Sequence, residues 1–200
     1  MNYLAHACLS FRNPGILTGN MISDFVKGKK KFEYPPAIRQ GIDLHRSIDG
    51  FTDAHAETAK AKAIFKPVFR LYAGAFIDVV YDHFLATDHK EFETENALNE
   101  FAQFTYGQLE LQKEFFPEKF RMMFAYMKTQ NWLYHYRTHE GIRNSFGGLV
   151  RRAAYLNDAA PAFILFEEHY AQLQTCYRNF FPELKQFAKN IFQHLNHGSH

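Results

Sequence analysis

One stretch in the middle of the chain carries two carboxylates and an imidazole inside a strongly apolar run. Residues 71–86 are apolar almost throughout, yet they include Asp78, Asp82 and His83. Asp78 and Asp82 are four apart, so a helix through this run places them on one face, one turn above the other. Burying such groups is costly unless something compensates them. The compensation is either a salt bridge, with Arg46 as the obvious partner, or a divalent cation.

The rest of the chain shows helical spacing of its apolar residues, and no segment alternates convincingly with a period of two. Proline and glycine at residues 13–15, 35–36, 66–67 and 117 divide it into helical segments. We predict that Thr52 or Asp53 caps a helix beginning near residue 54, and that residues 66–67 end it. The fold class expected from these signals is all-α, a helical bundle.

Size and composition fit one globular domain. The chain has 200 residues, of which 46% are hydrophobic and 22% charged, so we expect a single domain over residues 1–197. Residues 198–200 resemble the remnant of an expression tag. With 22 Phe and 11 Tyr, the core is expected to consist of large rings packed between helices, and a groove lined with rings is a further expectation.

Several functional classes are disfavoured. A formal net charge of +2 is too mild to indicate nucleic-acid binding. The N-terminal residues show no signal-peptide pattern and no apolar segment runs uninterrupted for about 18 residues, so we expect neither a signal peptide nor membrane association. Cys8 and Cys176 are isolated and suggest a reducing, cytoplasmic setting. We find no glycine-rich phosphate loop, nucleophile elbow or dinucleotide fingerprint.

Polar pairs at i, i+4 recur in four helical segments of the first 90 residues. These pairs are Asn2/His6, Asn20/Asp24, His45/Asp49 and Asp78/Asp82. Several helices can direct such residues to one centre, where His nitrogens and Asp oxygens bind a metal. A set without cysteine favours Mn²⁺ or Mg²⁺, and Fe²⁺ also fits. The alternative is structural: a single buried histidine is more often a hydrogen-bonded core residue, and an amide more often caps or bridges.

Other polar clusters have weaker signals. His135 and His139 resemble half of a metal site but are more simply structural or solvent-facing. The basic residues 27–31 are either a solvated helix end or a docking surface for an acidic partner. Arg151 and Arg152 could clamp a phosphate or lie on the surface as simple charges.

Four segments together resemble the acyl carrier protein phosphodiesterases, which are bacterial holo-acyl-carrier-protein hydrolases. They are MNYLAH at 1–6, GNMISDFVKG at 19–28, GIDLHRSIDGFTD at 41–53 and DVVYDHFL at 78–85. Weaker similarity occurs at Trp132 with Tyr136 and at Gly148 with Arg151 and Arg152. This family is similar to the HD-type metal-dependent phosphohydrolases, which implies an HD-like helical fold. The adjacent His-Asp pair that names the HD type is absent here, since the pairs Asp82-His83 and Asp88-His89 run in the opposite order.

The resemblance implies a reaction and a set of partners. The phosphodiester between 4′-phosphopantetheine and a serine of holo-acyl carrier protein would be hydrolysed, giving apo-acyl carrier protein and free 4′-phosphopantetheine. A divalent metal, with Mn²⁺ favoured, would assist. The expected catalytic residues are Asp24, His45, Asp78, Asp82 and His83; the expected metal ligands are the same five with His6 and Asp49.

Two further expectations concern the substrate and the helix that contains Asp82. Arg46, Arg151 and Arg152 would hold the phosphate, and the docking surface for the acidic carrier would be Lys27, Lys29 and Lys30. Asp78 and Asp82 are the safer ligands, because His83 lies about 100° from Asp82 around a helix and could instead orient a ligand or transfer a proton.

Two alternatives remain open. An HD-like phosphohydrolase acting on a nucleotide or another small phosphoester would not need a carrier-protein surface. A non-catalytic helical binding protein would use the polar pairs only as buried salt bridges.

Overall fold

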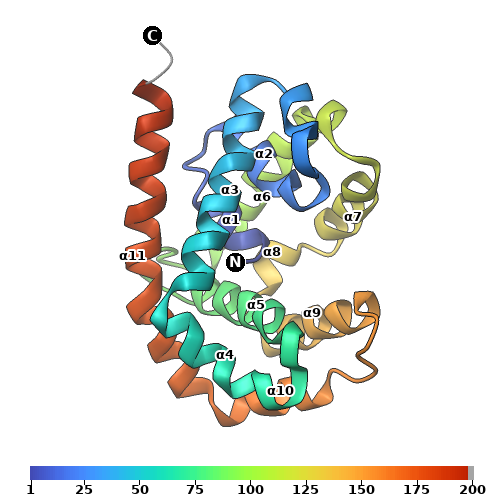
Figure 1. The fold of residues 1–200 in the computed structure, drawn as a ribbon, viewed down its shortest axis with the longest axis vertical. Helices are drawn as coiled ribbons and strands as arrows, with labels where there is room; N and C mark the ends of the chain where they lie inside the picture. Colours follow the sequence, from blue (N-terminus) through green and yellow to red (C-terminus); the bar gives the residue numbers. More distant parts are fainter. Residues whose placement is uncertain (198–200) are drawn as a thin grey trace.

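The computed structural model describes residues 1–197, and every regular element in that range is a helix (Figure 1). The all-α fold class predicted from the sequence is therefore confirmed. The suggested tag, residues 198–200, lies outside the described residues. The elements, in order, are α1 (Tyr3–Cys8), α2 (Pro14–Ile22), η1 (Ser23–Phe25), η2 (Gly28–Glu33), α3 (Pro36–Ala54), α4 (Ala56–Phe69), η3 (Arg70–Tyr72), α5 (Ala73–Ala86), α6 (Glu95–Leu111), η4 (Lys113–Phe115), α7 (Glu118–Thr129), α8 (Trp132–His135), α9 (His139–Arg152), α10 (Ala160–Glu168) and α11 (Tyr170–His197).

Helix α5 runs through the middle of the bundle, with α1 beside it and the long α11 along one side (Figure 1). Its ring Phe76 lies 5.9 Å, centroid to centroid, from Phe65 of α4 and 5.1 Å from Phe146 of α9. These contacts bear out the expected core of aromatic rings, whose large apolar areas hold the helices together. Among residues 1–197, no helix combines the length and the apolar character needed to cross a membrane.

Helices α2 and α3 approach each other closely, and two glycines make the approach possible. A Cβ atom at Gly19 would overlap the carbonyl oxygen of Ile38, and one at Gly41 would overlap that of Ile16. Only a residue without a side chain fits where two backbones meet in this way. The contact sets the end of α2, with Asn20, against the middle of α3, with His45.

The structure corrects the predicted limits of the helix that precedes α5. Residues 66–67 do not end it, because α4 continues through Pro67 to Phe69. Proline removes only one amide donor, and near the last turn the helix tolerates that loss. The chain reverses instead at Arg70, where φ is +48°. At the other end the cap is neither Thr52 nor Asp53 but His55, whose Nδ1 accepts from the Glu57 amide at 3.2 Å.

Candidate metal centre

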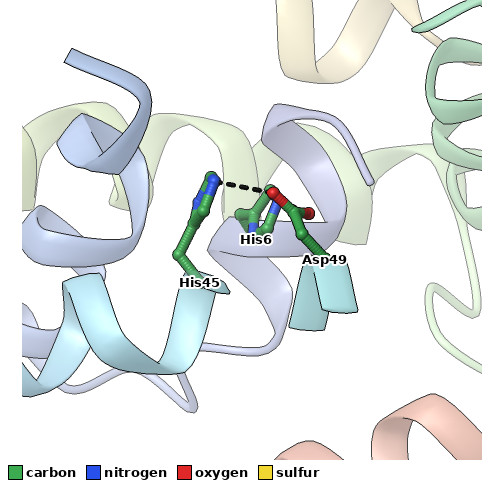
Figure 2. A group of neighbouring side chains, drawn as sticks. All are labelled: His6, His45 and Asp49. Atoms are coloured by element: carbon green, nitrogen blue, oxygen red, sulfur yellow. Dashed lines mark ion pairs between the residues drawn. The ribbon is translucent and has the colours of Figure 1, made fainter. Parts of the chain in front are cut away.

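Three side chains from two helices meet beside the start of the chain (Figure 2). His6 comes from α1, and His45 and Asp49 come from successive turns of α3. His45 Nε2 lies 3.0 Å from Asp49 Oδ2, and His6 Nε2 lies 3.3 Å from Asp49 Oδ1. The two imidazole rings are stacked, with centroids 3.9 Å apart. Potential ligand atoms of all three residues lie within 4.8 Å of one another, which is close enough for one ion to contact them all.

Asn20, at the end of α2, sets the orientation of both imidazoles. Its Oδ1 lies 2.8 Å from His6 Nδ1, and its backbone oxygen lies 2.8 Å from His45 Nδ1. The Asn20 amide nitrogen donates to the His6 carbonyl and to Ser10 Oγ, which fixes which end of the amide is oxygen. Both oxygens only accept, so each Nδ1 donates a proton and each Nε2 is directed towards Asp49. This arrangement is typical of metal-binding histidines.

His6 supplies the clearest sign that the centre fits a cation. The residue is only 2% exposed, and its Nε2 has no hydrogen-bond partner among the described residues, although Asp49 lies at ion-pair distance. A buried nitrogen without a partner costs free energy. Two imidazole nitrogens and a carboxylate are the donors that first-row divalent metals accept. The residues present therefore fit a divalent metal.

Charge in the centre is divided unequally between the two histidines. Burial, followed by the neighbouring His45, lowers the pKa of His6 to about 4. Burial also lowers the pKa of His45, but hydrogen bonds to Asp24 and Asp49 outweigh it and raise the value to about 9. Burial opposes ionisation of Asp49, yet His45 and His6 together hold its pKa well below the usual range. Without a cation at neutral pH, His45 therefore carries a proton on both ring nitrogens, whereas His6 is neutral.

Asp24 and Asp78 flank the centre on different elements. Asp24, in η1, has a side chain that is 65% exposed, and its Oδ1 lies 3.2 Å from His45 Nε2. Asp78, in α5, lies 3.1 Å from the α-amino nitrogen of Met1, which is itself 3.3 Å from Asp49 Oδ1. Both carboxylates thus adjoin the centre, but only Asp24 touches one of its histidines directly.

Asp82 is buried, and its carboxylate is hydrogen-bonded to the backbone of α1. Its two carboxylate oxygens accept from the amides of Leu4 at 2.7 Å and of Ala5 at 3.2 Å. Burial raises the pKa of Asp82 to about 7, against the lowering effect of these two amides. The carboxylate therefore fixes the first turn of α1, immediately before His6, and acts on the centre through that residue.

His83 lies apart from the centre. Its Nδ1 is 2.8 Å from the carbonyl oxygen of Tyr136, and its Nε2 is 3.0 Å from the hydroxyl of Tyr170. A carbonyl only accepts, so Nδ1 donates and Nε2 accepts from the tyrosine. Both ring nitrogens are therefore engaged, and burial lowers the pKa of His83 to about 4. The structure does not bring this residue together with Asp49.

This environment gives a prediction about stability. The folded-state pKa of His83, about 4, lies below its unfolded value of 6.5, so the unfolded chain binds the proton first as the pH falls. The stabilisation of the folded state that comes from keeping His83 neutral is complete above pH 6.5. It is lost as the pH falls to about 4, and it amounts to on the order of 3 kcal/mol. Urea unfolding across this range should show a smaller pH-dependent loss in His83→Gln than in the wild type. Equal losses would contradict the assignment, and exposed His89→Gln is the control.

Four of the predicted substrate-binding residues, and two further histidines considered in the sequence, are exposed at the surface. Arg46 is exposed, and its Nη2 donates to the carbonyl of Val26, so it is not the partner of Asp78 or Asp82. Lys27, Lys29 and Lys30 are exposed on and beside η2. His135 and His139 are also exposed, and His139 pairs with Glu167.

Arg151 and Arg152 line a cavity of about 770 Å³. The cavity lies between α9, which carries both arginines, and residues of α1, α5, α7 and α8. Sequence reasoning did not identify the α7 residues Met122, Met123 and Tyr126 as part of this cavity. The only signal, for Tyr126 alone, was the general excess of aromatic residues, which predicts rings but not their place.

Comparison with known proteins identifies one family. A family model described as acyl carrier protein phosphodiesterase matches residues 1–184. Curated relatives named acyl carrier protein phosphodiesterase include one from Serratia proteamaculans, 34% identical over 95% of this chain and 98% of the relative. Others come from Photorhabdus laumondii, 31% identical over 95% and 96%, and Klebsiella pneumoniae, 32% identical over 95% and 98%. No solved structure matches significantly.

Proposed function

The chain belongs to the acyl carrier protein phosphodiesterase family, and we propose that it hydrolyses the phosphodiester of holo-acyl carrier protein with the help of a divalent metal. The products are apo-acyl carrier protein and 4′-phosphopantetheine. The observation that carries the metal dependence is the group formed by His6, His45 and Asp49, with its partnerless Nε2 on His6. The further likeness to the HD-type phosphohydrolases stays a prediction.

The ligands proposed for the ion are His6 Nε2, His45 Nε2 and the Asp49 carboxylate, with Asp24 at the open side. This mixture of nitrogen and oxygen donors without sulfur suits Mn²⁺, and Mg²⁺ or Fe²⁺ are the alternatives. When bound, the ion supplies positive charge that offsets the phosphodiester anion and makes water more acidic.

The surrounding residues have distinct tasks in this proposal. Asn20 holds the His6 ring and, through its backbone oxygen, the His45 ring. Asp82 fixes the backbone before His6. Asp24 is the exposed carboxylate beside His45, so it is the residue placed to accept a proton from the attacking water. Arg152 and Arg151, at the cavity wall, attract the phosphate.

A direct assay tests the proposed reaction. Holo-acyl carrier protein is incubated with the enzyme and Mn²⁺ or Mg²⁺, and its mass is followed. We expect the mass to fall by that of the 4′-phosphopantetheine group. An unchanged carrier mass under every metal tested would exclude the reaction. A panel of nucleotides and simple phosphoesters distinguishes the small-molecule phosphohydrolase, which would act without a carrier.

The exposed surface formed by Lys27, Lys29, Lys30 and Phe32 is the proposed docking site for the carrier. Phe32 is 61% exposed beside three lysines whose side chains face solvent. Acyl carrier proteins are acidic, so the lysines attract the partner and the ring supplies apolar contact.

The variant Lys29→Glu/Lys30→Glu should raise KM for holo-acyl carrier protein about 10-fold at low salt, with kcat nearly unchanged. The difference should shrink as salt is added, because the interaction is between exposed charges. Lys90→Glu/Lys189→Glu makes the same charge change at two other exposed lysines and should leave KM unaltered. Equal KM values for the two double variants would show that the carrier protein docks on another surface.

A further inference from the structure

The cavity bounded by α7, α8 and α9 has the size and position of a ligand site. Its volume of about 770 Å³ falls in the range of small-molecule pockets. The residues that matter for its chemistry are Asn2, Met122, Tyr126, Gln130, Trp132 and Asn144. Met122 is 57% exposed and Tyr126 is 64% exposed, although both are large apolar side chains. Such side chains gathered at an open cavity are typical of surfaces that a ligand covers.

The cavity is lined in part by α1, the helix that also carries His6 of the candidate metal centre. Asn2 and Tyr3 lie at the start of α1, the helix that carries His6, and both line the cavity. Val79, which also lines it, directly follows Asp78 in α5. Tyr3 connects the two regions electrostatically: burial and then the Asp24 carboxylate raise its pKa, while the Arg152 guanidinium lowers it. A molecule whose phosphate lies at the centre could therefore extend along α1 towards this cavity.

We propose that this cavity binds the pantetheine arm of holo-acyl carrier protein while the phosphodiester lies at the metal centre. The assignment rests on the proposed function and adds to it the place where the leaving group is recognised. The arm extends from the phosphate as a linear, uncharged chain with two methyl groups on one carbon, a hydroxyl, two amides and a terminal thiol.

The chemistry of the lining matches that of the arm. Met122, Met123, Tyr126 and Trp132 offer polarisable apolar surface for the methyl groups and the sulfur. Asn2, Gln130 and Asn144 offer amide groups that can pair with the two amides of the arm. A purely apolar acyl chain would leave the side-chain amides of Asn2 and Asn144 facing apolar groups. Lys119, Arg151 and Arg152 on the same wall suit the phosphate at one end of the arm. The mixed lining thus favours an amide-containing chain that ends in a phosphate.

The chain contains its own reporter for this site. Trp132 is the single tryptophan of the sequence, and it is partly buried in the cavity wall. Pantetheine, which lacks the phosphate, is titrated into the wild-type protein while Trp132 fluorescence is recorded. We expect a saturable change in emission. Inorganic phosphate at the same concentrations should produce no such change.

A double variant tests whether the signal comes from the cavity. Met122→Ala/Tyr126→Ala removes two exposed side chains from the wall and should weaken pantetheine binding about 10-fold. It should raise KM for holo-acyl carrier protein by a similar factor. Tyr155→Ala removes a tyrosine that is still more exposed, at 85%, and does not line the cavity, and should match the wild type.

Either of two results overturns the assignment: pantetheine produces no saturable signal, or the double variant keeps the wild-type KM. Failure of the proposed function looks different, because the wild type would then leave holo-acyl carrier protein intact. Pantetheine binding without any hydrolysis would refute the reaction and support the cavity as a site for the arm.

Discussion

His45→Ala is expected to reduce the turnover of holo-acyl carrier protein by on the order of 10³-fold or more. His45 Nε2 lies between two carboxylates, 3.0 Å from Asp49 Oδ2 and 3.2 Å from Asp24 Oδ1. Removing the ring takes away one of two nitrogen donors and separates Asp24 from the rest of the centre. The measurement is the rate of carrier mass loss with Mn²⁺ in excess.

Two further variants make this result specific. His89→Ala removes an exposed histidine far along the chain and should retain full turnover. Asn20→Ala deletes the acceptor of His6 Nδ1 but leaves the backbone oxygen that holds His45. It should therefore weaken metal affinity about 10- to 100-fold without abolishing binding. Turnover within about threefold of wild type in a folded His45→Ala protein would show that the centre is not catalytic.

Asp82→Ala is expected to lower the free energy of unfolding by about 3 kcal/mol. The substitution leaves two buried amides, those of Leu4 and Ala5, without their acceptors. Both residues are fully buried, so water cannot replace the carboxylate. Urea unfolding at fixed pH and metal concentration measures the change. Asp82→Asn retains one oxygen acceptor and should cost less.

The variant Asp82→Ala also distinguishes a structural role of Asp82 from a role as a metal ligand. We expect a chelator to cost the variant as much stability as it costs the wild type, because Asp82 binds backbone and not the ion. Unchanged stability together with loss of metal binding would instead identify Asp82 as a ligand. The wild type with and without chelator provides the reference.

The polar pairs in the sequence identified the residues in and around the centre, but not which of them meet in it and which contact the neighbouring backbone. His45 and Asp49 share a face of α3, as their spacing predicts, and they meet His6 from another helix. Asp78 and Asp82 share a face of α5 in the same way, yet one adjoins the amino group of Met1 and the other accepts from α1 amides. The spacing of two residues determines whether their side chains share a face of one helix. It does not determine which group of a neighbouring helix each side chain meets.

Contacts between distant segments explain what the sequence could not give. His83 is directed towards Tyr136 and Tyr170, which lie 53 and 87 residues further along the chain. Gly19 and Gly41 look like ordinary helical glycines until α2 and α3 are placed together. The cavity is assembled from five helices, so no local pattern describes it. The all-helical class, in contrast, follows from periodicity within each segment and was correctly predicted.

The central claim is that His6, His45 and Asp49 hold a divalent ion on which turnover depends, and calorimetric titration of metal-free protein with Mn²⁺ tests it most directly. We expect about one ion per chain and, near pH 7, release of about one proton, because a pKa of about 9 leaves His45 protonated before binding. Chelator should abolish carrier hydrolysis and added Mn²⁺ should restore it. Stoichiometric binding that persists in His6→Ala/His45→Ala, or hydrolysis that continues in chelator, would contradict the claim.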